Sequence, residues 1–231
     1  MVLRKFIYIL SLTCLALTSG CGYDESDTSQ GVITYKVTYP KMEKGNFMLD
    51  FMPKKMEMKF QEDIYATNLS AGMGMFKSSF ICDKNNGEFV QMVKLINKKY
   101  ALKLDAEGIK SSIKARPSLS IEHTNEVKNI LGYHCKKAIV TLNNDKQDAF
   151  TVYYTDQIQM ESPNWCNEFI NIDGVLLEYQ YEKYDVCMRF TASKIEFKEI
   201  DDKEFELATD YVIISESEMD KEMKEIFDSF N

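Results

Sequence analysis

Hydrophobic and polar residues alternate along most of the chain. Every second residue from Ile33 to Tyr39 is apolar, and the segment from Met56 to Phe60 has the same period of two. This period is typical of strands with one buried face. It predicts further strands at 63–69, 76–82, 88–96, 99–104, 119–124, 134–142, 149–155, 175–182 and 186–198.

The end of the chain changes to a helical period. Ser215 and Glu218 form a capping-box pattern, and apolar residues then recur at helical spacing from Met219 to Phe230. An amphipathic helix is therefore expected here, with a shorter one between 105 and 115. The predicted fold class is α+β, mainly antiparallel β: a strongly curved, incomplete barrel with the C-terminal helix packed on it.

The first residues have the layout of a bacterial export signal. Arg4 and Lys5 precede an apolar stretch at 6–17, which is too short to span a bilayer, and small residues lead to Cys21. This layout resembles the lipobox of bacterial lipoproteins, in which the cysteine carries the lipid. It predicts a lipoprotein signal peptide at 1–20, a lipidated cysteine with a polar tether at 21–30 and a single curved-sheet domain at 31–231. A plain secretory signal that ends near a cysteine is the alternative.

The charge balance argues against nucleic acid as a partner. The chain has 28 Lys and Arg against 36 Asp and Glu, a net charge of −8, and nucleic-acid binding needs a positive footprint. The expected partners are a membrane, reached through the covalent lipid, and an apolar ligand or an envelope protein. We expect the chain in the cell envelope, anchored to the outer membrane of a Gram-negative bacterium.

Four of the six cysteines lie outside the signal and the anchor: Cys82, Cys135, Cys166 and Cys187. In an oxidising envelope they are candidates for two disulfides, with three pairings that the sequence leaves open. Buried free thiols are the main alternative. A metal site is disfavoured, because the chain has only two histidines and no C-x-x-C motif. Neither a metal nor a cofactor is expected.

Motifs of catalysis are missing from the sequence. It contains no G-x-S-x-G elbow, no P-loop and no H-E-x-x-H motif. His134 and Cys135 are neighbours in a predicted strand, where adjacent side chains point to opposite faces. The sequence therefore predicts no enzymatic activity.

Methionine is unusually frequent, with 13 residues in the chain. Its flexible side chain suits an apolar cavity for an acyl chain, although ordinary core packing and a Cu(I) site are alternatives. The candidate cavity residues are Met56, Met58, Phe60, Met73, Met75, Tyr179 and Tyr181.

Three segments together resemble secreted Gram-negative families of unknown function. Residues 130–138 (ILGYHCKKA) resemble an I-x-G-Y-K-C-K-K-A segment, 152–158 (VYYTDQI) resemble W-Y-T-x-E-I, and 172–178 (IDGVLLE) are similar to the segment that names the GLPGLI family. Domain of unknown function 4412 shares these features. The resemblance implies a lipoprotein-carrier-like fold with a hydrophobic cavity.

The expected function is that of a non-catalytic, membrane-anchored lipoprotein. It would bind a lipid, an acyl chain or a lipoprotein segment in an apolar cavity. The alternatives are a structural or partner-binding lipoprotein with a solid core, and a Cu(I)-handling protein.

Replacing Cys21 with Ser tests the predicted anchor. Cys21→Ser should leave a folded protein that no longer fractionates with membranes, because the later apolar segments are too short or too polar to hold a bilayer. Cell fractionation of the wild type and the variant is the measurement. Membrane association of the variant equal to that of the wild type would contradict the prediction.

Overall fold

A computed structural model describes residues 28–143 and 148–228, in which twelve strands form one open sheet with two α-helices. This confirms a mainly antiparallel β fold that also carries helices. The strands are β1 (Gln30–Thr38), β2 (Lys55–Gln61), β3 (Ile64–Ala71), β4 (Phe76–Asp83), β5 (Glu88–Leu95), β6 (Lys98–Leu104), β7 (Leu119–Ile130), β8 (Tyr133–Leu142), β9 (Ala149–Thr155), β10 (Val175–Lys183), β11 (Val186–Phe197) and β12 (Val212–Ile213). The helices are α1 (Ala106–Ala115), α2 (Glu216–Asp228) and the short 3-10 helices η1 (Phe47–Asp50), η2 (Gly72–Gly74) and η3 (Asp202–Phe205).

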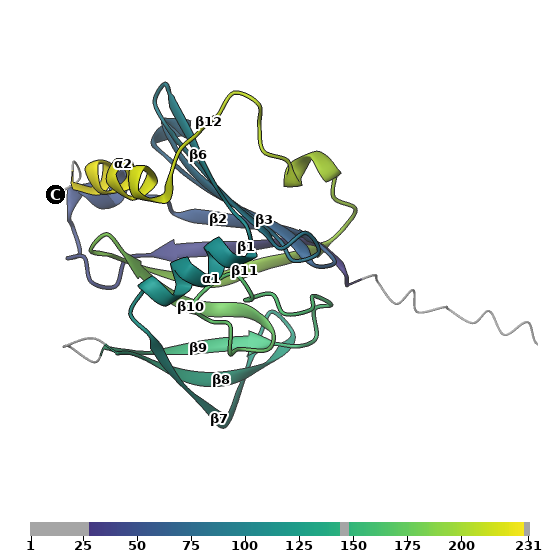
Figure 1. The fold of residues 1–231 in the computed structure, drawn as a ribbon. Helices are drawn as coiled ribbons and strands as arrows, with labels where there is room; N and C mark the ends of the chain where they lie inside the picture. Colours follow the sequence, from purple (N-terminus) through teal and green to yellow (C-terminus); the bar gives the residue numbers. More distant parts are fainter. Residues whose placement is uncertain (1–27, 144–147, 229–231) are drawn as a thin grey trace, which may run out of the picture.

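The sheet consists of two meanders that meet at β1 and β11. Its order is β12-β6-β5-β4-β3-β2-β1-β11-β10-β9-β8-β7, and the pairs are antiparallel except for β12 with β6. Strands β1 to β6 are neighbours in chain order, as are β7 to β11; most are joined by short turns, but longer connections at 39–54 and 156–174 join β1 to β2 and β9 to β10. Figure 1 shows the two meanders splaying apart from β1 and β11, with α1 between them.

The short link through α1 requires the sheet to bend. In the sheet order, ten strand spacings separate β6 from β7, which is about 48 Å in a flat sheet. The ten-residue α1 spans only about 15 Å, and the extended residues on its two sides add at most about 21 Å. A flat sheet is therefore incompatible with the connection between β6 and β7.

Alternating burial confirms the strand pattern expected from the sequence. Ile33, Tyr35 and Val37 of β1 are buried, whereas Lys36 and Thr38 are exposed. The buried face joins a core cluster that also contains Leu177 of β10 and residues of α2. One continuous apolar face thus holds the two meanders together.

The C-terminal helix begins where the capping box predicted it. The Ser215 backbone N–H donates to the Glu218 carboxylate at 2.9 Å, and the Glu218 N–H donates to the Ser215 hydroxyl at 3.3 Å. Met219 and Met223 are buried in the core, so these residues of α2 pack on the sheet. The predicted contribution of Phe230 falls outside the described residues.

Two strand boundaries depart from the sequence-based prediction. β7 continues to Ile130 instead of ending near Thr124, because an irregularity between His123 and Val127 lets the pairing with β8 resume. The two-residue β12 was not predicted, since a segment this short carries no periodicity.

The predicted signal peptide at 1–20, Cys21 and most of the tether lie outside the described residues. Within the described residues, 28–143 and 148–228, no helix has the length and apolar character needed to cross a bilayer.

Truncation of Leu177 tests the importance of the shared core. Leu177 is fully buried in β10, so Leu177→Ala should lower the free energy of unfolding by about 2 to 5 kcal/mol through lost burial and a cavity. The control Val127→Ala, at a 54% exposed position of β7, should change it by about 0.5 kcal/mol or less. Urea denaturation measures both values, and equal losses in the two variants would contradict the assignment of the core.

Candidate functional site

A pocket of about 210 Å³ lies between the two meanders. One wall comes from β2 to β5 and includes Met58, Thr67 and Gln91. The opposite wall comes from β10 and β11. Helix α2 contributes Met223, and the connection 156–174 contributes residues 163, 164 and 166 to 169. The bend of the sheet therefore creates a site whose two walls are far apart in the sequence.

An aromatic cluster centred on Tyr179 forms one wall of this pocket. The Tyr179 ring stacks on Phe190 with centroids 4.9 Å apart, and Tyr35 and Phe169 meet it edge-on at 6.0 and 5.9 Å. Such pairs prefer defined geometries, so the cluster is a rigid apolar surface. Burial raises the pKa of both Tyr179 and Tyr181, and the nearby Glu168 carboxylate raises it further. The two phenols therefore remain protonated at neutral pH.

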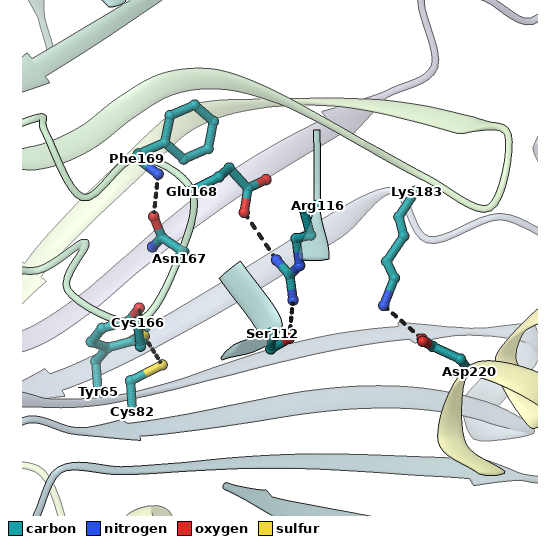
Figure 2. A network of polar contacts seen from close by, with 10 residues as sticks. All are labelled: Tyr65, Cys82, Ser112, Arg116, Cys166, Asn167, Glu168, Phe169, Lys183 and Asp220. Atoms are coloured by element: carbon teal, nitrogen blue, oxygen red, sulfur yellow. Dashed lines mark hydrogen bonds and ion pairs between the residues drawn. The ribbon is translucent and has the colours of Figure 1, made fainter. Parts of the chain in front are cut away.

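Arg116 and Glu168, both in the lining of the pocket, form an ion pair (Figure 2). Arg116 follows the last turn of α1 and donates to the Glu168 carboxylate at 3.1 Å and to the Ser112 hydroxyl at 3.5 Å. A second pocket of about 250 Å³ shares this pair, together with Tyr181 and Lys183. The ion pair thus stands where two hollows adjoin and offers a donor and an acceptor to each.

Internal hydrogen bonds shape the connection 156–174. The buried Asn164 amide donates to the carbonyls of Ile172 and Gly174 at 2.8 and 3.0 Å. Gly174 has a φ of +146°, and a Cβ at this position would lie 2.7 Å from the Thr155 carbonyl oxygen. Only glycine fits there without displacement of β9. The start of β10 is thus held against β9 by this close approach and against the connection by the hydrogen bond from Asn164.

The lining combines apolar surface with a few polar groups. This composition is typical of small-ligand sites, in which aromatic side chains supply contact area and polar groups fix the orientation. Within 28–143 and 148–228, no group of three or more His, Cys, Asp or Glu residues is placed to hold a metal ion. The arrangement suits a ligand that has apolar faces and several hydroxyl or amide groups.

Four of the seven predicted cavity residues lie on the pocket wall: Met56, Met58, Tyr179 and Tyr181. Phe60 is fully buried in the core, and Met75 is 53% exposed. The side chain of Met73 lies outside the described part of the structure. The structure therefore brings together the residues of β2 and β10 and places Phe60 and Met75 elsewhere.

All four predicted disulfide cysteines are buried and carry free thiols in this structure. Cys82 and Cys166 lie on the pocket wall, and their sulfur atoms are 2.8 Å apart. Cys135 lies in β8 and Cys187 in β11.

Comparisons with known proteins identify the family. The family model described as "N-glycanase peptide, N-terminal domain" matches residues 58–195, which is more than half of the chain. The chain belongs to this family. The solved structure "Structure of PNGF-II in C2 space group" is similar in fold, with a TM-score of 0.52 and 17% identity. The match covers 84% of this chain and 32% of that chain, so the protein spans about a third of its length. No curated protein matches the chain.

Membership of the N-glycanase N-terminal domain family corrects the resemblance to the GLPGLI family, domain of unknown function 4412 and the lipoprotein carriers. The three segments that suggested this resemblance lie where strands turn or pair. Residues 130–138 contain the turn between β7 and β8, 152–158 contain the end of β9, and 172–178 contain the close approach at Gly174. Constraints of this kind recur wherever antiparallel strands meet, so they did not distinguish one family from another.

The expected non-catalytic, lipid-binding function is also wrong, as is the prediction of no enzymatic activity. Both are overturned by the match to an N-glycanase family, and so are the alternatives of a structural lipoprotein and a Cu(I)-handling protein. The physical reason is visible in the pocket. An acyl chain has no partner for the paired charges of Arg116 and Glu168, or for the amide of Gln91.

The sequence analysis missed the polar residues of the site. Arg116, Glu168 and Lys183 belong to no motif and come from three separate segments. One signal was available: the connection 156–174 exceeds the length of about 12 to 15 residues beyond which loops are mostly functional or disordered.

A pH-dependent contact holds α2 beside the pocket. The Lys183 ammonium donates to the Asp220 carboxylate at 2.9 Å, and the Tyr184 hydroxyl donates to the same oxygen. Burial favours a higher pKa of Asp220, but these two hydrogen bonds outweigh it and hold the pKa below its usual value. The carboxylate therefore stabilises the fold when it is ionised.

Replacing Asp220 with Asn should lower the free energy of unfolding at pH 7 by less than about 1 kcal/mol, because the side chain is half exposed and its charge is screened. The stabilising contribution of the Asp220 carboxylate is fully present above the pKa of about 3.9 that an aspartate has in the unfolded chain. It is lost as the pH falls through the lower pKa of Asp220 in the folded protein. Denaturation curves from pH 7 to pH 2 should show the difference between the wild type and Asp220→Asn shrinking toward zero. A difference that does not change with pH would refute this account.

Proposed function

We propose that this chain acts in the removal of N-linked glycans and that its pocket holds the glycan of a glycosylated peptide. The proposal is supported by membership of the N-glycanase N-terminal domain family and by the similarity in fold to PNGF-II. Because the chain spans about a third of that structure's chain, we assign it the step for which its geometry is suited, which is binding of the substrate.

The pairing of an aromatic wall with the Arg116–Glu168 ion pair is the observation that carries the proposal. A sugar ring presents C–H groups on its faces and hydroxyl groups at its edge. The apolar C–H faces match the rings of Tyr179 and Phe169, while Glu168 accepts and Arg116 donates hydrogen bonds at the edge. Protonated Tyr181 adds a further hydroxyl donor.

The adjoining second pocket gives the site room for more than one ligand unit. The two hollows of about 210 and 250 Å³ meet at Arg116, Glu168 and Phe169. We assign the first hollow to sugar units and the second, bounded by Leu119 and Phe150, to neighbouring parts of the same glycopeptide.

Binding of an N-glycosylated peptide tests the proposal. The wild-type protein should bind the glycopeptide at least tenfold more tightly than the same peptide without its glycan. Arg116→Gln and Glu168→Gln should each weaken glycopeptide binding by about tenfold, or about 1.4 kcal/mol, because each removes a charged hydrogen-bond partner of the sugar hydroxyls. Isothermal titration calorimetry supplies the dissociation constants.

The control is Lys136→Gln, which removes an exposed ion pair with Asp156 outside both pockets and should leave the affinity unchanged. Mass spectrometry of the same mixtures follows conversion of the glycopeptide to a peptide without its glycan. We expect any conversion to fall with the affinity in both pocket variants. Equal affinity for the peptide with and without its glycan would rule out the proposed role of the pocket.

We also propose that the bend of the sheet amounts to the strongly curved, incomplete barrel expected from the sequence. Support comes from the short α1 link between β6 and β7 and from the burial of Met219 and Met223 of α2. Export by the predicted signal at 1–20 and anchoring through Cys21 remain a proposal for the location of the chain, tested by Cys21→Ser.

A further inference from the structure

Two cysteine thiols meet on the wall of the pocket. Cys82 lies in β4, and Cys166 lies in the connection 156–174, 84 positions further along the chain. Their sulfur atoms are 2.8 Å apart, and the Tyr65 hydroxyl lies 3.3 Å from the sulfur of Cys166 (Figure 2). All three residues are buried.

We propose that Cys82 and Cys166 form a disulfide that fastens the connection 156–174 to the sheet. A disulfide has an S–S bond of about 2.05 Å, so the two sulfur atoms need to approach by only about 0.8 Å from their present separation of 2.8 Å. Among the described residues, neither Cys135 nor Cys187 has a sulfur contact with another cysteine. Of the bonds possible among the four cysteines, the geometry selects the one between Cys82 and Cys166.

The surroundings give the two thiols different roles in bond formation. Hydrogen bonds from the Cys82 thiol and the Tyr65 hydroxyl favour the thiolate of Cys166 and lower its pKa, whereas burial raises the pKa of Cys82. Because the thiolate is the nucleophile in exchange, Cys166 is the thiol that attacks first.

The oxidant is a protein or small-molecule disulfide. The Cys166 thiolate attacks one of its sulfur atoms, the oxidant's S–S bond breaks, and a mixed disulfide forms with release of one thiol. The Cys82 thiolate then attacks the sulfur of Cys166, and the second thiol of the oxidant leaves. In total, Cys82 and Cys166 lose two protons and two electrons, and the oxidant's disulfide gains them as two thiols.

Both thiols are buried in the packed protein. The disulfide joins this buried point of the connection 156–174 to β4. It holds Asn167, Glu168 and Phe169, which follow Cys166 directly and line the pocket. The effect on glycan binding rests on the proposed function, whereas the disulfide itself does not.

Peptide mapping of the full chain tests the pairing. The purified protein is equilibrated in a glutathione redox buffer, denatured with an alkylating reagent and digested without reduction. The expected result is one linked peptide that contains Cys82 and Cys166, with alkylated Cys135 and Cys187. Alkylation of all four cysteines, or any other linked pair, would overturn the proposal whether or not the chain binds a glycan.

Thermal unfolding supplies a second readout. A reductant should lower the Tm of the oxidised wild type and of the control Cys187→Ser by roughly 5 to 15 °C, because the bond closes a long loop. The same reductant should leave the Tm of Cys82→Ser and Cys166→Ser unchanged. If neither variant folds, mapping of the wild type decides the question. A Tm of the wild type that does not respond to reductant would also overturn the proposal.

Discussion

The structure depends on the short connection between the opposite ends of two meanders. Strands β6 and β7 are ten spacings apart in the sheet, yet only α1 and a few extended residues join them. The distance that the link can cover is about 12 Å shorter than the width of a flat sheet. Bending of the sheet satisfies the link, and burial of the inward faces on one shared core compensates for the ordering of both meanders.

The side chains of the bent sheet alone do not fill the space between its two meanders. The connection 156–174 and helix α2 enter the remaining space, and hydrogen bonds of Asn164 and Asn167 hold the connection internally. Because the connection is held by such local bonds and by its contact with β4, it forms a firm side of the pocket. The site is therefore a consequence of how the fold closes, and its chemistry is set by the few residues that do the closing.

The sequence predicted the elements well and the site poorly, for one physical reason. Strands such as β1 and the cap of α2 are encoded by residues that are neighbours or near neighbours, so periodicity and capping reveal them. Arg116 and Glu168 are 52 positions apart and meet only because α1 returns the chain between the meanders. The inward faces of their strands correctly placed Met56 and Tyr179 at a cavity. The face of a strand does not reveal whether a residue lines a cavity or lies in the packed core, and Phe60, on the same strand as Met56, lies in the core.

The Arg116–Glu168 pair also shows why the polar part of the pocket points to a ligand. Removing two charges from water costs about as much as their attraction returns, so a partly buried ion pair adds little net stability. The Glu168 side chain is only 16% exposed, and replacing such a pair by well-packed apolar residues is often neutral for stability. A rigid pair of donors and acceptors beside an aromatic wall has a clear benefit once a ligand with hydroxyl groups is present, because the paired side chains are already oriented and little further ordering is needed. The pair is thus better explained by recognition of a ligand than by stability, which supports the proposal that the pocket binds a glycan.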